Sequence, residues 1–304
     1  MYHFIVNLKS GSGKGRLIWA SLEQYLRHTH TPYLAHYTRD CGHARCISAS
    51  LTAGSSPVTL IAVGGDGTAN EVIDGIVRLD KVTFGYIPTG SSNDLARGLG
   101  LPKDPLLILQ QILHPKRLLP IYLGRSCARK KARRFAVSCG IGYDAAVCHE
   151  ALRSPLKTAL NRIHLGKLTY LGIALKQLLM QRPISAAVET DDGTVYRFPR
   201  LFFLAAMNFP FEGGGFQFCP QADPSDGLLD LCIVHTIPKW KILLMLPTAF
   251  FGKHVHIKGV QILRCSRVRI LTASPLAVHT DGESLGFQNH LILESEREPL
   301  HFII

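Results

Sequence analysis

Apolar and polar positions alternate in regular blocks along the first 115 or so residues. In the clearest block an apolar run, Val58 to Val63, is typical of a buried parallel strand. Apolar positions from Ala69 to Val77 then recur at i, i+3, i+4, i+7 and i+8, as on one face of an amphipathic helix. Similar strand and helix pairs occupy residues 4–26, 33–52 and 82–99, and a further helix is expected at 106–113. This alternation predicts an α/β domain with a parallel sheet and helices on both faces.

The pattern changes near Leu118, after which short strand-like runs dominate. We expect strands at 118–123, 135–139, 184–189, 195–198, 201–207, 228–234, 260–265, 268–271 and 290–294, and helices at 165–180 and 239–251. The segment Asp191-Asp-Gly-Thr194 is a hairpin turn signal. The sequence therefore predicts two domains: residues 1–117, α/β, and residues 118–304, a mostly antiparallel β-sandwich. The last five residues are expected to form a strand that returns to the first domain.

Composition restricts the possible functions. The chain has 304 residues, of which 46% are hydrophobic and 18% charged, as in folded two-domain proteins. Its net charge of +12 favours anionic partners. None of the eight cysteines forms a CxxC pair, which favours reduced thiols over disulfides or zinc. The start of the chain does not resemble a signal peptide, and the run 242–251, interrupted by Pro247, is too short to span a membrane. We therefore expect a cytoplasmic protein, soluble or peripheral to a membrane.

Three glycines within four residues separate the strand and helix of the first block. Gly64, Gly65 and Gly67 are expected to allow positive φ and close approach to a bulky group. The helix that follows favours an anion at its N-terminus, so the segment predicts a phosphate site; a tight turn without a ligand is the alternative. Residues 7–15 and 88–94 also follow strands, and all three loops should meet at the carboxyl edge of the sheet. The 7–15 loop departs from the P-loop motif, because no Ser or Thr follows Lys14.

Two of these segments resemble a known family. Gly64-Gly-Asp-Gly-Thr-Ala-Asn-Glu71 and Ile87-Pro-Thr-Gly-Ser-Ser-Asn-Asp-Leu-Ala-Arg97 are similar to motifs of the diacylglycerol kinase catalytic-domain family. Asn7–Gly15, Ser225–Asp230 and Asp281-Gly-Glu283 extend the resemblance over nearly the whole chain, to the soluble bacterial lipid kinases related to sphingosine kinases. The resemblance implies an α/β nucleotide-binding domain, a β-sandwich domain and an active site in the cleft between them.

The resemblance also implies roles for single residues. Those expected to hold ATP are Asn7, Ser10, Gly11, Ser12, Gly13, Lys14, Thr38, Gly64, Gly65, Asp66, Gly67, Thr68, Ala69, Asn70, Ser91 and Asn93. Asp66 would help to place Mg²⁺, and Asp94 would complete the catalytic set. Asn93 and Asp94 are equally suited to capping the next helix, and this does not conflict with catalysis. Lys14 and Arg97 are candidates for neutralising phosphate charge.

Two further carboxylates follow from the resemblance in the second half. Glu283 is expected to be the general base that takes the proton of the lipid hydroxyl; without the resemblance it would be an ordinary turn carboxylate. Asp226 and the carbonyls of Asp223 and Leu228 are expected to bind a structural Mg²⁺, since oxygen ligands suit a hard cation. The alternative is that Asp226-Gly227 forms an ordinary turn without a metal.

Basic clusters suggest where a membrane would bind. One comprises Arg125, Arg129, Lys130, Lys131, Arg133 and Arg134; the other comprises Lys253, His254, His256 and Lys258, next to Trp240, Leu243, Leu244, Leu246, Phe250 and Phe251. A basic rim beside apolar groups suits an anionic bilayer, whereas burial of the apolar groups in the core is the alternative. No nucleic-acid-binding module is recognisable, so nucleic acid is not an expected partner.

The expected activity is transfer of the γ-phosphoryl group of ATP, with Mg²⁺, to a lipid alcohol at the inner face of the membrane. Diacylglycerol is the expected acceptor and phosphatidic acid the product, which belongs to phospholipid biosynthesis. An NAD kinase shares the Gly-Gly-Asp-Gly motif and the two-domain plan, and a catalytically silent lipid-binding protein on the same fold is a second alternative. The sequence does not identify the lipid. It does not determine the oligomeric state either, and a homodimer is one of the options.

Overall fold

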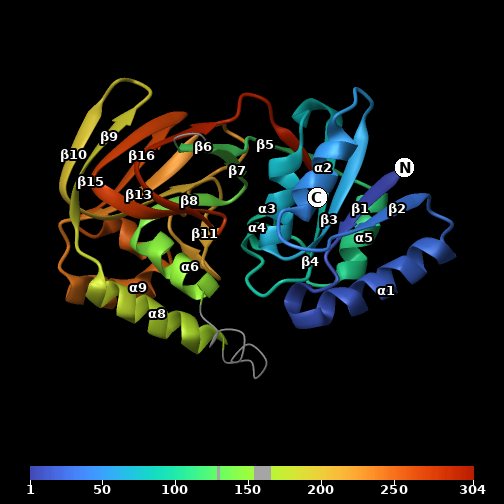
Figure 1. The fold of residues 1–304 in the computed structure, drawn as a ribbon, viewed down its shortest axis with the longest axis horizontal. Coiled ribbons are helices and arrows are strands. Elements are labelled where there is room, and N and C mark those ends of the chain that lie inside the picture. The colour runs from blue at the N-terminus through green and yellow to red at the C-terminus, as the bar shows by residue number, and fades with distance from the viewer. Residues whose placement is uncertain (129–130, 154–165) are drawn as a thin grey trace. The chain divides into compact units, whose positions relative to one another are not determined.

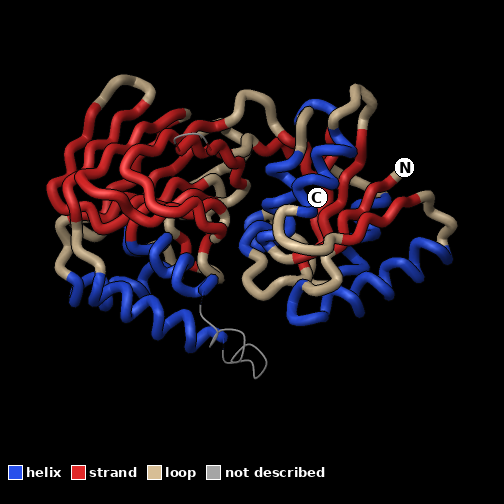
Figure 2. The backbone as a smooth tube through the Cα atoms, viewed as in Figure 1, coloured by secondary structure: helices blue, strands red, loops and turns tan. Residues whose placement is uncertain are grey.

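The computed structural model describes residues 1–128, 131–153 and 166–304, which form two compact units (Figures 1 and 2). Unit 1 contains residues 1–123, 224–227 and 296–304, and unit 2 contains residues 124–223 and 228–295. The expected fold class is confirmed: a mostly parallel sheet with helices in the first unit, and antiparallel strands in the second. Within the described residues, no helix has both the length and the apolar character needed to cross a membrane.

Unit 1 is built on a six-stranded sheet of order β2-β1-β3-β4-β17-β5, in which every neighbouring pair is parallel except β17 and β5. Its strands are β1 (Tyr2–Val6), β2 (Tyr33–Tyr37), β3 (Val58–Gly64), β4 (Val82–Pro88), β5 (Leu118–Ile121) and β17 (Leu300–Ile303). Its helices are α1 (Lys14–His28), α2 (His43–Thr52), α3 (Asp66–Gly75), α4 (Asp94–Gly98) and α5 (Pro105–Leu113), with 3₁₀ turns at Ser10–Gly13 and Leu79–Lys81.

Both faces of the unit 1 sheet are covered, which explains the continuous apolar run in β3. Strand residues Val6, Ile61 and Ile87 pack in one core with residues of α1 and α5. On the other face α2 and α3 contact each other closely: Ser48 Oγ donates a hydrogen bond to the Val72 carbonyl at 2.6 Å. Because neither face of β3 meets water, every residue from Leu60 to Gly64 is buried.

Unit 2 is a nine-stranded antiparallel sheet that closes on itself. β9 pairs with both β10 and β15, and these two strands also pair with β8. The strands are β6 (Gly124–Ala128), β7 (Lys131–Phe135), β8 (Ser138–Gly142), β9 (Ile184–Thr190), β10 (Val195–Met207), β13 (Leu229–His235), β14 (Val260–Cys265), β15 (Arg267–Thr280) and β16 (Glu283–Ser295). A separate hairpin pairs β11 (Phe211–Glu212) with β12 (Phe216–Gln217).

Helices cover the outside of this sheet in Figure 1. They are α6 (Tyr143–Arg153), α8 (Gly166–Met180) and α9 (Lys239–Ala249), followed by a 3₁₀ turn at Lys253–His256. One core lies within the closed sheet and includes Val188, Leu204 and Val278. A second core includes Phe202 and Val234 of the sheet together with Leu178 of α8 and Ile242 of α9.

Several expected elements of unit 2 need correction. The runs 195–198 and 201–207 form one strand, β10, which passes Pro199 with a shift of register between Phe198 and Leu201. Helix α6 was not predicted, because its sequence is much less apolar than those of α8 and α9. The Asp191–Thr194 turn joins β9 to β10 as expected. Leu165, the first residue of the expected helix 165–180, lies outside the described residues.

The expected strand 135–139 is wrong for a reason that matters for the site. β7 ends at Phe135 and β8 begins at Ser138, and between them the backbone turns toward Asp281. The Asp281 carboxylate accepts hydrogen bonds from the N–H groups of Ala136, Val137 and Ser138 at 2.8, 2.8 and 2.9 Å. A side chain from the β15–β16 turn thus replaces a strand as the partner of this backbone.

We predict that removing this carboxylate destabilises unit 2. Asp281→Ala leaves three N–H groups without their acceptor, which should lower the free energy of unfolding by about 3–5 kcal/mol in equilibrium urea unfolding. Asp281→Asn keeps one oxygen and should lose about half as much. Glu298→Ala, at an exposed carboxylate near the C-terminus, is the control and should stay within about 0.5 kcal/mol of wild type. Equal losses in the alanine and control variants would contradict the role of Asp281.

Candidate active site

The carboxyl ends of the parallel strands in unit 1 bring three polar loops together. Asn7 follows β1, and its Nδ2 donates to Thr68 Oγ1 at the start of α3, at 3.0 Å. Ser10 Oγ and Thr89 Oγ1, after β1 and β4, lie 2.5 Å apart. The Thr89 N–H donates to the Gly64 carbonyl at 2.8 Å. The loops that sequence spacing assigned to one edge therefore form a single hydrogen-bonded group, at the edge where ligands bind in such sheets.

The glycines of these loops serve close packing. Gly64, Gly65 and Gly67 do not adopt positive φ, so that expectation is wrong. A Cβ on Gly64 would lie 2.5 Å from Thr68 Cβ, and one on Gly90 would lie 2.8 Å from the Cα of Gly65. The backbone of one loop thus rests directly on that of the next. Helix α3 begins at Asp66, which places Asp66, Gly67 and Thr68 in its first turn, where the N–H groups have no helical partners.

The loop after β1 does use the left-handed conformation. Gly11, Ser12 and Gly13 have φ values of 56°, 57° and 97°. A Cβ on Gly11 would lie 2.2 Å from the Thr89 carbonyl oxygen, so this position also needs glycine. Ser12 holds this conformation with a Cβ, which costs about 1 kcal/mol. Lys14 then begins α1 and is exposed, as a side chain that contacts a phosphate must be.

A buried tyrosine lies close to two of the predicted carboxylates and is hydrogen-bonded to one of them. The Tyr86 hydroxyl, on β4, donates to Asp66 Oδ1 at 3.4 Å. Burial raises the pKa of Tyr86 well above its usual value, and the nearby charges of Asp66 and Asp94 raise it further. Tyr86 therefore remains a proton donor beside both carboxylates. Sequence analysis missed it, although a tyrosine in an apolar strand is a signal, because a buried hydroxyl needs a partner.

The remaining residues predicted for this site, both ATP ligands and the Asp94–Arg97 pair, differ in accessibility. Asp94 is buried and forms an ion pair with Arg97 at 2.5 Å, so Arg97 is bound to a carboxylate of its own helix. Asn93 has a φ of 51° and donates from Nδ2 to the Gly90 carbonyl, and Ser91 is exposed. Thr38 donates its N–H to the Val6 carbonyl. Ala69 and Asn70 are 0% and 1% exposed, so their side chains belong to the interior of unit 1.

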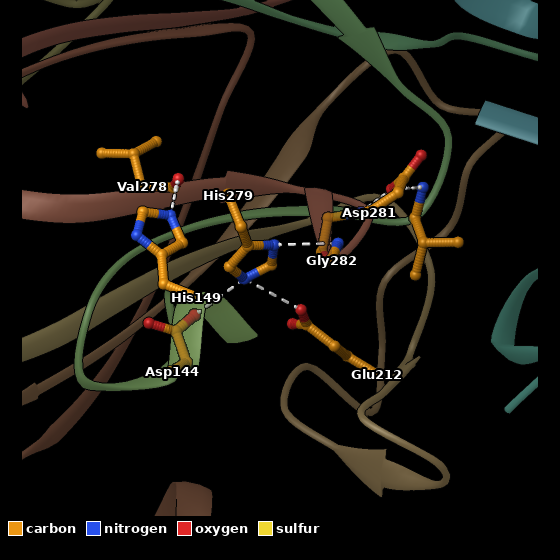
Figure 3. A network of polar contacts seen from close by, with 9 residues as sticks. Asp144, His149, Glu212, Val278, His279, Asp281 and Gly282 are labelled. Carbon is orange, nitrogen blue, oxygen red and sulfur yellow. Dashed lines mark hydrogen bonds and ion pairs between the residues drawn. The ribbon is translucent and has the colours of Figure 1, made fainter. Parts of the chain in front are cut away.

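In unit 2 the predicted base lies on a turn that is held from two sides. Glu283 is the first residue of β16, after Asp281 and Gly282, whose φ values are 47° and 81°. Asp281 binds the backbone of residues 136–138, as described above. The Gly282 N–H donates to His279 Nδ1 at 3.1 Å (Figure 3). The half-exposed Glu283 side chain forms no hydrogen bond or ion pair with the described residues, which leaves its carboxylate available.

The predicted metal ligands lie on a turn where the chain passes between the two units. Asp226 belongs to unit 1, whereas Asp223 and Leu228 belong to unit 2. Gly227 has a φ of 75°, and Tyr122 donates its N–H to the Pro224 carbonyl at 2.9 Å. Asp223 and Asp226 are exposed. The turn is formed as expected, and its metal remains a prediction.

Family models match both halves of the chain. Residues 1–124 match the model of the diacylglycerol kinase catalytic domain. Residues 137–296 match the YegS C-terminal NAD kinase beta sandwich-like domain. The chain is 30% identical over 292 residues to YtlR of Bacillus subtilis strain 168, whose name describes it as a lipid kinase, and the match covers 94% of each chain. It is also 29% identical to a diacylglycerol kinase of the same strain, over 74% of this chain and 70% of the relative.

Solved structures share the fold. A diacylglycerol kinase from Bacillus anthracis superposes with a TM-score of 0.70 at 18% identity, covering 99% of this chain and 96% of that one. An NAD kinase from Archaeoglobus fulgidus, solved with ATP, superposes with a TM-score of 0.55 at 14% identity, covering 100% and 94%. The matches over both units show that this chain belongs to the bacterial diacylglycerol kinase-like family of lipid kinases and is a phosphotransferase.

Proposed function

We propose that this enzyme transfers the γ-phosphoryl group of ATP to the free hydroxyl of diacylglycerol, giving phosphatidic acid, with Mg²⁺ as cofactor. The observation that carries the proposal is the Asp281–Glu283 turn, in which two sets of hydrogen bonds fix the backbone while the Glu283 carboxylate has no described partner. A carboxylate presented in this way can bind and deprotonate an alcohol.

ATP would bind at the carboxyl edge of the unit 1 sheet. The first turn of α3 presents backbone N–H groups at the positive end of the helix dipole, and the α1 loop contributes three successive left-handed residues and the exposed Lys14. Such backbone groups favour phosphate oxygens. The relatives named as diacylglycerol kinases support the same nucleotide role.

The groups at this edge fit a hard cation. Asp66 and Asp94 supply carboxylate oxygens beside the Tyr86 hydroxyl, and Asn93 Oδ1 is buried without a hydrogen-bond partner among the described residues. We propose that Asp66 and Asp94 hold Mg²⁺, which neutralises charge on the transferred phosphoryl group when bound. A second, structural Mg²⁺ would bind Asp226 and the carbonyls of Asp223 and Leu228.

Glu283 would act as the general base. The lipid hydroxyl oxygen forms a bond to the γ-phosphorus, the bond from that phosphorus to the β-phosphate oxygen breaks, and ADP leaves. The hydroxyl proton passes to a Glu283 carboxylate oxygen. The base contributes orientation and proton transfer, and the larger part of the catalysis comes from positioning and charge neutralisation in the nucleotide site.

A pocket beside the Glu283 hairpin suits an acyl chain. It has a volume of roughly 390 Å³ and lies between α6, α8 and the β15–β16 hairpin. Apolar side chains dominate its wall, among them Met180, Leu276, Ala277 and Phe287. The same hairpin carries Glu283 at its turn, so one element would hold both the chain and the reacting end of a lipid.

An exposed apolar surface on α8 and α9 supports contact with a bilayer. α9 buries Ile242, Met245 and Ala249, so the helix does contribute to the core. Leu246 is half-buried, whereas Trp240 and Leu244 of the helix are 66% and 68% exposed and Phe251, just after it, is 74% exposed. Lys239 Nζ donates to the Leu179 carbonyl at the end of α8, which joins the exposed Leu179 and Met180 to the same surface. We call Leu179, Met180, Trp240, Leu244 and Phe251 the α8–α9 surface.

Basic residues surround part of this surface, as an anionic bilayer requires. Lys253, His256 and Lys258 are exposed after α9. His254 is an exception to the predicted cluster: it is 1% exposed, and burial lowers its pKa, so it does not contribute charge at the surface. In the other predicted cluster Arg125, Arg133 and Arg134 lie on β6 and β7, whereas Arg129 and Lys130 lie outside the described residues. We propose that the α8–α9 surface docks on the anionic inner leaflet of the membrane.

The proposed reaction is tested by supplying labelled ATP and Mg²⁺ with a panel of acceptors: diacylglycerol, a sphingoid base, undecaprenol and NAD. We expect label in diacylglycerol. Glu283→Gln should lower kcat by at least about 100-fold while ATP binding, measured by calorimetry, is unchanged, because the amide keeps the shape and cannot accept the proton. The matched control is Glu298→Gln, at an exposed carboxylate of unit 1.

Each other outcome has a definite meaning. Label in NAD alone would show that the protein is an NAD kinase. Label in a lipid other than diacylglycerol would show that this lipid is the substrate. No label in any acceptor would favour a silent lipid-binding protein. Full turnover in Glu283→Gln would remove Glu283 as the base while leaving the kinase assignment intact.

Membrane docking is tested by cosedimentation with phosphatidylglycerol and phosphatidylcholine vesicles. The double change Trp240→Ala and Phe251→Ala should weaken binding to both lipids by about 10-fold or more, through lost apolar contact. The double change Lys253→Gln and Lys258→Gln should weaken binding to phosphatidylglycerol alone, since each lysine contributes about 1 kcal/mol near an anionic surface. Leu17→Ala, at a 73% exposed leucine of unit 1, is the control. Unchanged binding of the aromatic double variant would contradict the proposal.

A further inference from the structure

Beneath the Glu283 turn, His279 lies between two carboxylates from different elements. His279 Nε2 is 3.2 Å from Asp144 Oδ2, in the first turn of α6, and 3.1 Å from Glu212 Oε1, on β11 (Figure 3). The His279 side chain is fully buried, and those of Asp144 and Glu212 are 9% and 12% exposed. Burying two carboxylates so close together is costly unless a donor or cation lies between them.

A glycine makes this arrangement possible. A Cβ on Gly140, in β8, would lie 1.8 Å from Asp144 Oδ2 and 2.4 Å from His279 Nε2. Any side chain at position 140 would therefore occupy the space in which the histidine and the aspartate meet. The backbone of β8 forms one wall of the site.

The other ring nitrogen identifies what lies between the carboxylates. Burial lowers the pKa of His279, but nearby Cys148 and Glu212 and the hydrogen bonds to Asp144 and Glu212 outweigh it and raise the pKa well above its usual value. A doubly protonated ring would, however, point an Nδ1–H at the Gly282 N–H, whose nitrogen lies 3.1 Å from Nδ1 and is oriented as a donor. From this contact we take Nδ1 as the acceptor and place the ring proton on Nε2, where it is donated to the two carboxylates. A metal ion bound to Nε2 would require the proton on Nδ1, facing the Gly282 N–H as a second donor. The group between the carboxylates is therefore a proton, although the three side chains could otherwise coordinate a metal.

The two carboxylates share the His279 Nε2–H, and their charges repel. Burial raises the pKa of the Asp144 carboxyl, while the hydrogen bond from His279 opposes the rise. Glu212 Oε2 is buried and has no hydrogen-bond partner among the described residues. The pair depends on His279 for its orientation and in turn fixes the plane and tautomer of the ring.

We propose that His279 is a positioning residue for the catalytic turn: Asp144 and Glu212 lock its ring as the Nε2–H tautomer, so that Nδ1 holds the Gly282 N–H and with it the backbone of Glu283. This inference rests on the proposed role of Glu283 as the base. It assigns functional importance to Asp144, Glu212 and His279, none of which touches the reacting atoms in the proposed reaction. These three side chains act on Glu283 only through the backbone N–H of Gly282.

Two substitutions test the two ring nitrogens of His279 separately. Asn Oδ1 is as many bonds from Cα as His Nδ1, so His279→Asn keeps an acceptor for Gly282 but loses the donor to the carboxylates. Gln Nε2 is as many bonds from Cα as His Nε2, so His279→Gln keeps the donor and loses the acceptor. We expect His279→Gln to lower kcat about 10- to 100-fold with an unchanged KM for ATP, and His279→Asn to stay within about 3-fold of wild type.

Stability should follow the opposite order, and this distinguishes positioning from general structural damage. His279→Asn leaves two buried carboxylates without a donor and should have the lower Tm, whereas His279→Gln should be closer to wild type. Amide hydrogen exchange at Gly282 should be fast in the glutamine variant and slow in the asparagine variant. The same substitutions at His254, a buried histidine that bonds to the Phe218 carbonyl, are the controls and should leave kcat unchanged.

Several results would overturn the inference. If kcat falls in step with Tm across the four variants, His279 has a structural role alone. If Gly282 exchange is alike in both His279 variants, the Nδ1 contact does not hold the turn. If the purified protein contains stoichiometric metal and His279→Asn loses it, then a metal ion, and not a proton, lies between the two carboxylates. If wild type phosphorylates no acceptor, the proposed function fails. Amide exchange at Gly282 then still shows whether His279 Nδ1 binds the Gly282 N–H.

Discussion

The cost of burying carboxylates without donors shapes the part of this protein that carries Glu283. Asp281 is satisfied by three consecutive backbone N–H groups, and that requirement ends one strand and begins the next at residues 135–138. Asp144 and Glu212 are satisfied through His279, which also binds Gly282. Because Asp281, Asp144 and Glu212 each depend on a particular donor in a particular place, the turn that carries Glu283 has little freedom. A general base gains from this rigidity, since small displacements at a reacting group are costly.

Glycine provides the equivalent constraint in unit 1. The loops after β1, β3 and β4 touch backbone to backbone at Gly11, Gly65 and Gly90, where a Cβ would collide or crowd the neighbouring loop. This close contact aligns Asn7, Thr68 and Thr89 in one hydrogen-bonded group. The glycines therefore serve first to assemble the edge of the sheet. In the proposed nucleotide site an anion binds to the backbone N–H groups of this assembly, and the glycine-rich pattern would then indicate the site indirectly.

The hairpin of β11 and β12 contributes to two features of unit 2. Glu212 on β11 contacts His279, while Phe216 on β12 stacks on Phe250 with ring centroids 4.0 Å apart. Gln217 also donates to the Phe250 carbonyl, next to Phe251 of the α8–α9 surface. One short element thus contacts both the network beneath the proposed base and the end of the helix proposed to meet the membrane.

The sequence alone determined the two-domain architecture, the family and most of the candidate chemistry. Alternating apolar blocks specify a parallel sheet, because strands covered on both faces must be apolar throughout, and β3 shows this directly. The motifs around Asp66, Asn93 and Glu283 are each a short contiguous segment, so they can be recognised from the sequence without the structure. The short helix α6 was missed, since polar residues interrupt its apolar ones and leave no apolar run such as those of α8 and α9, and α6 carries Asp144.

Tertiary structure alone decided which side chains share a site. Asp144, Glu212 and His279 are separated by 67 or more positions, and strand pairing and a single Gly140 bring them together. Tyr86 looked like a core residue until its hydroxyl was seen beside Asp66. The fold also buries the polar His254 and leaves the apolar Trp240 exposed, which is the reverse of what their side chains alone suggest. Such facts depend on contacts between distant segments, and no spacing along the chain encodes them.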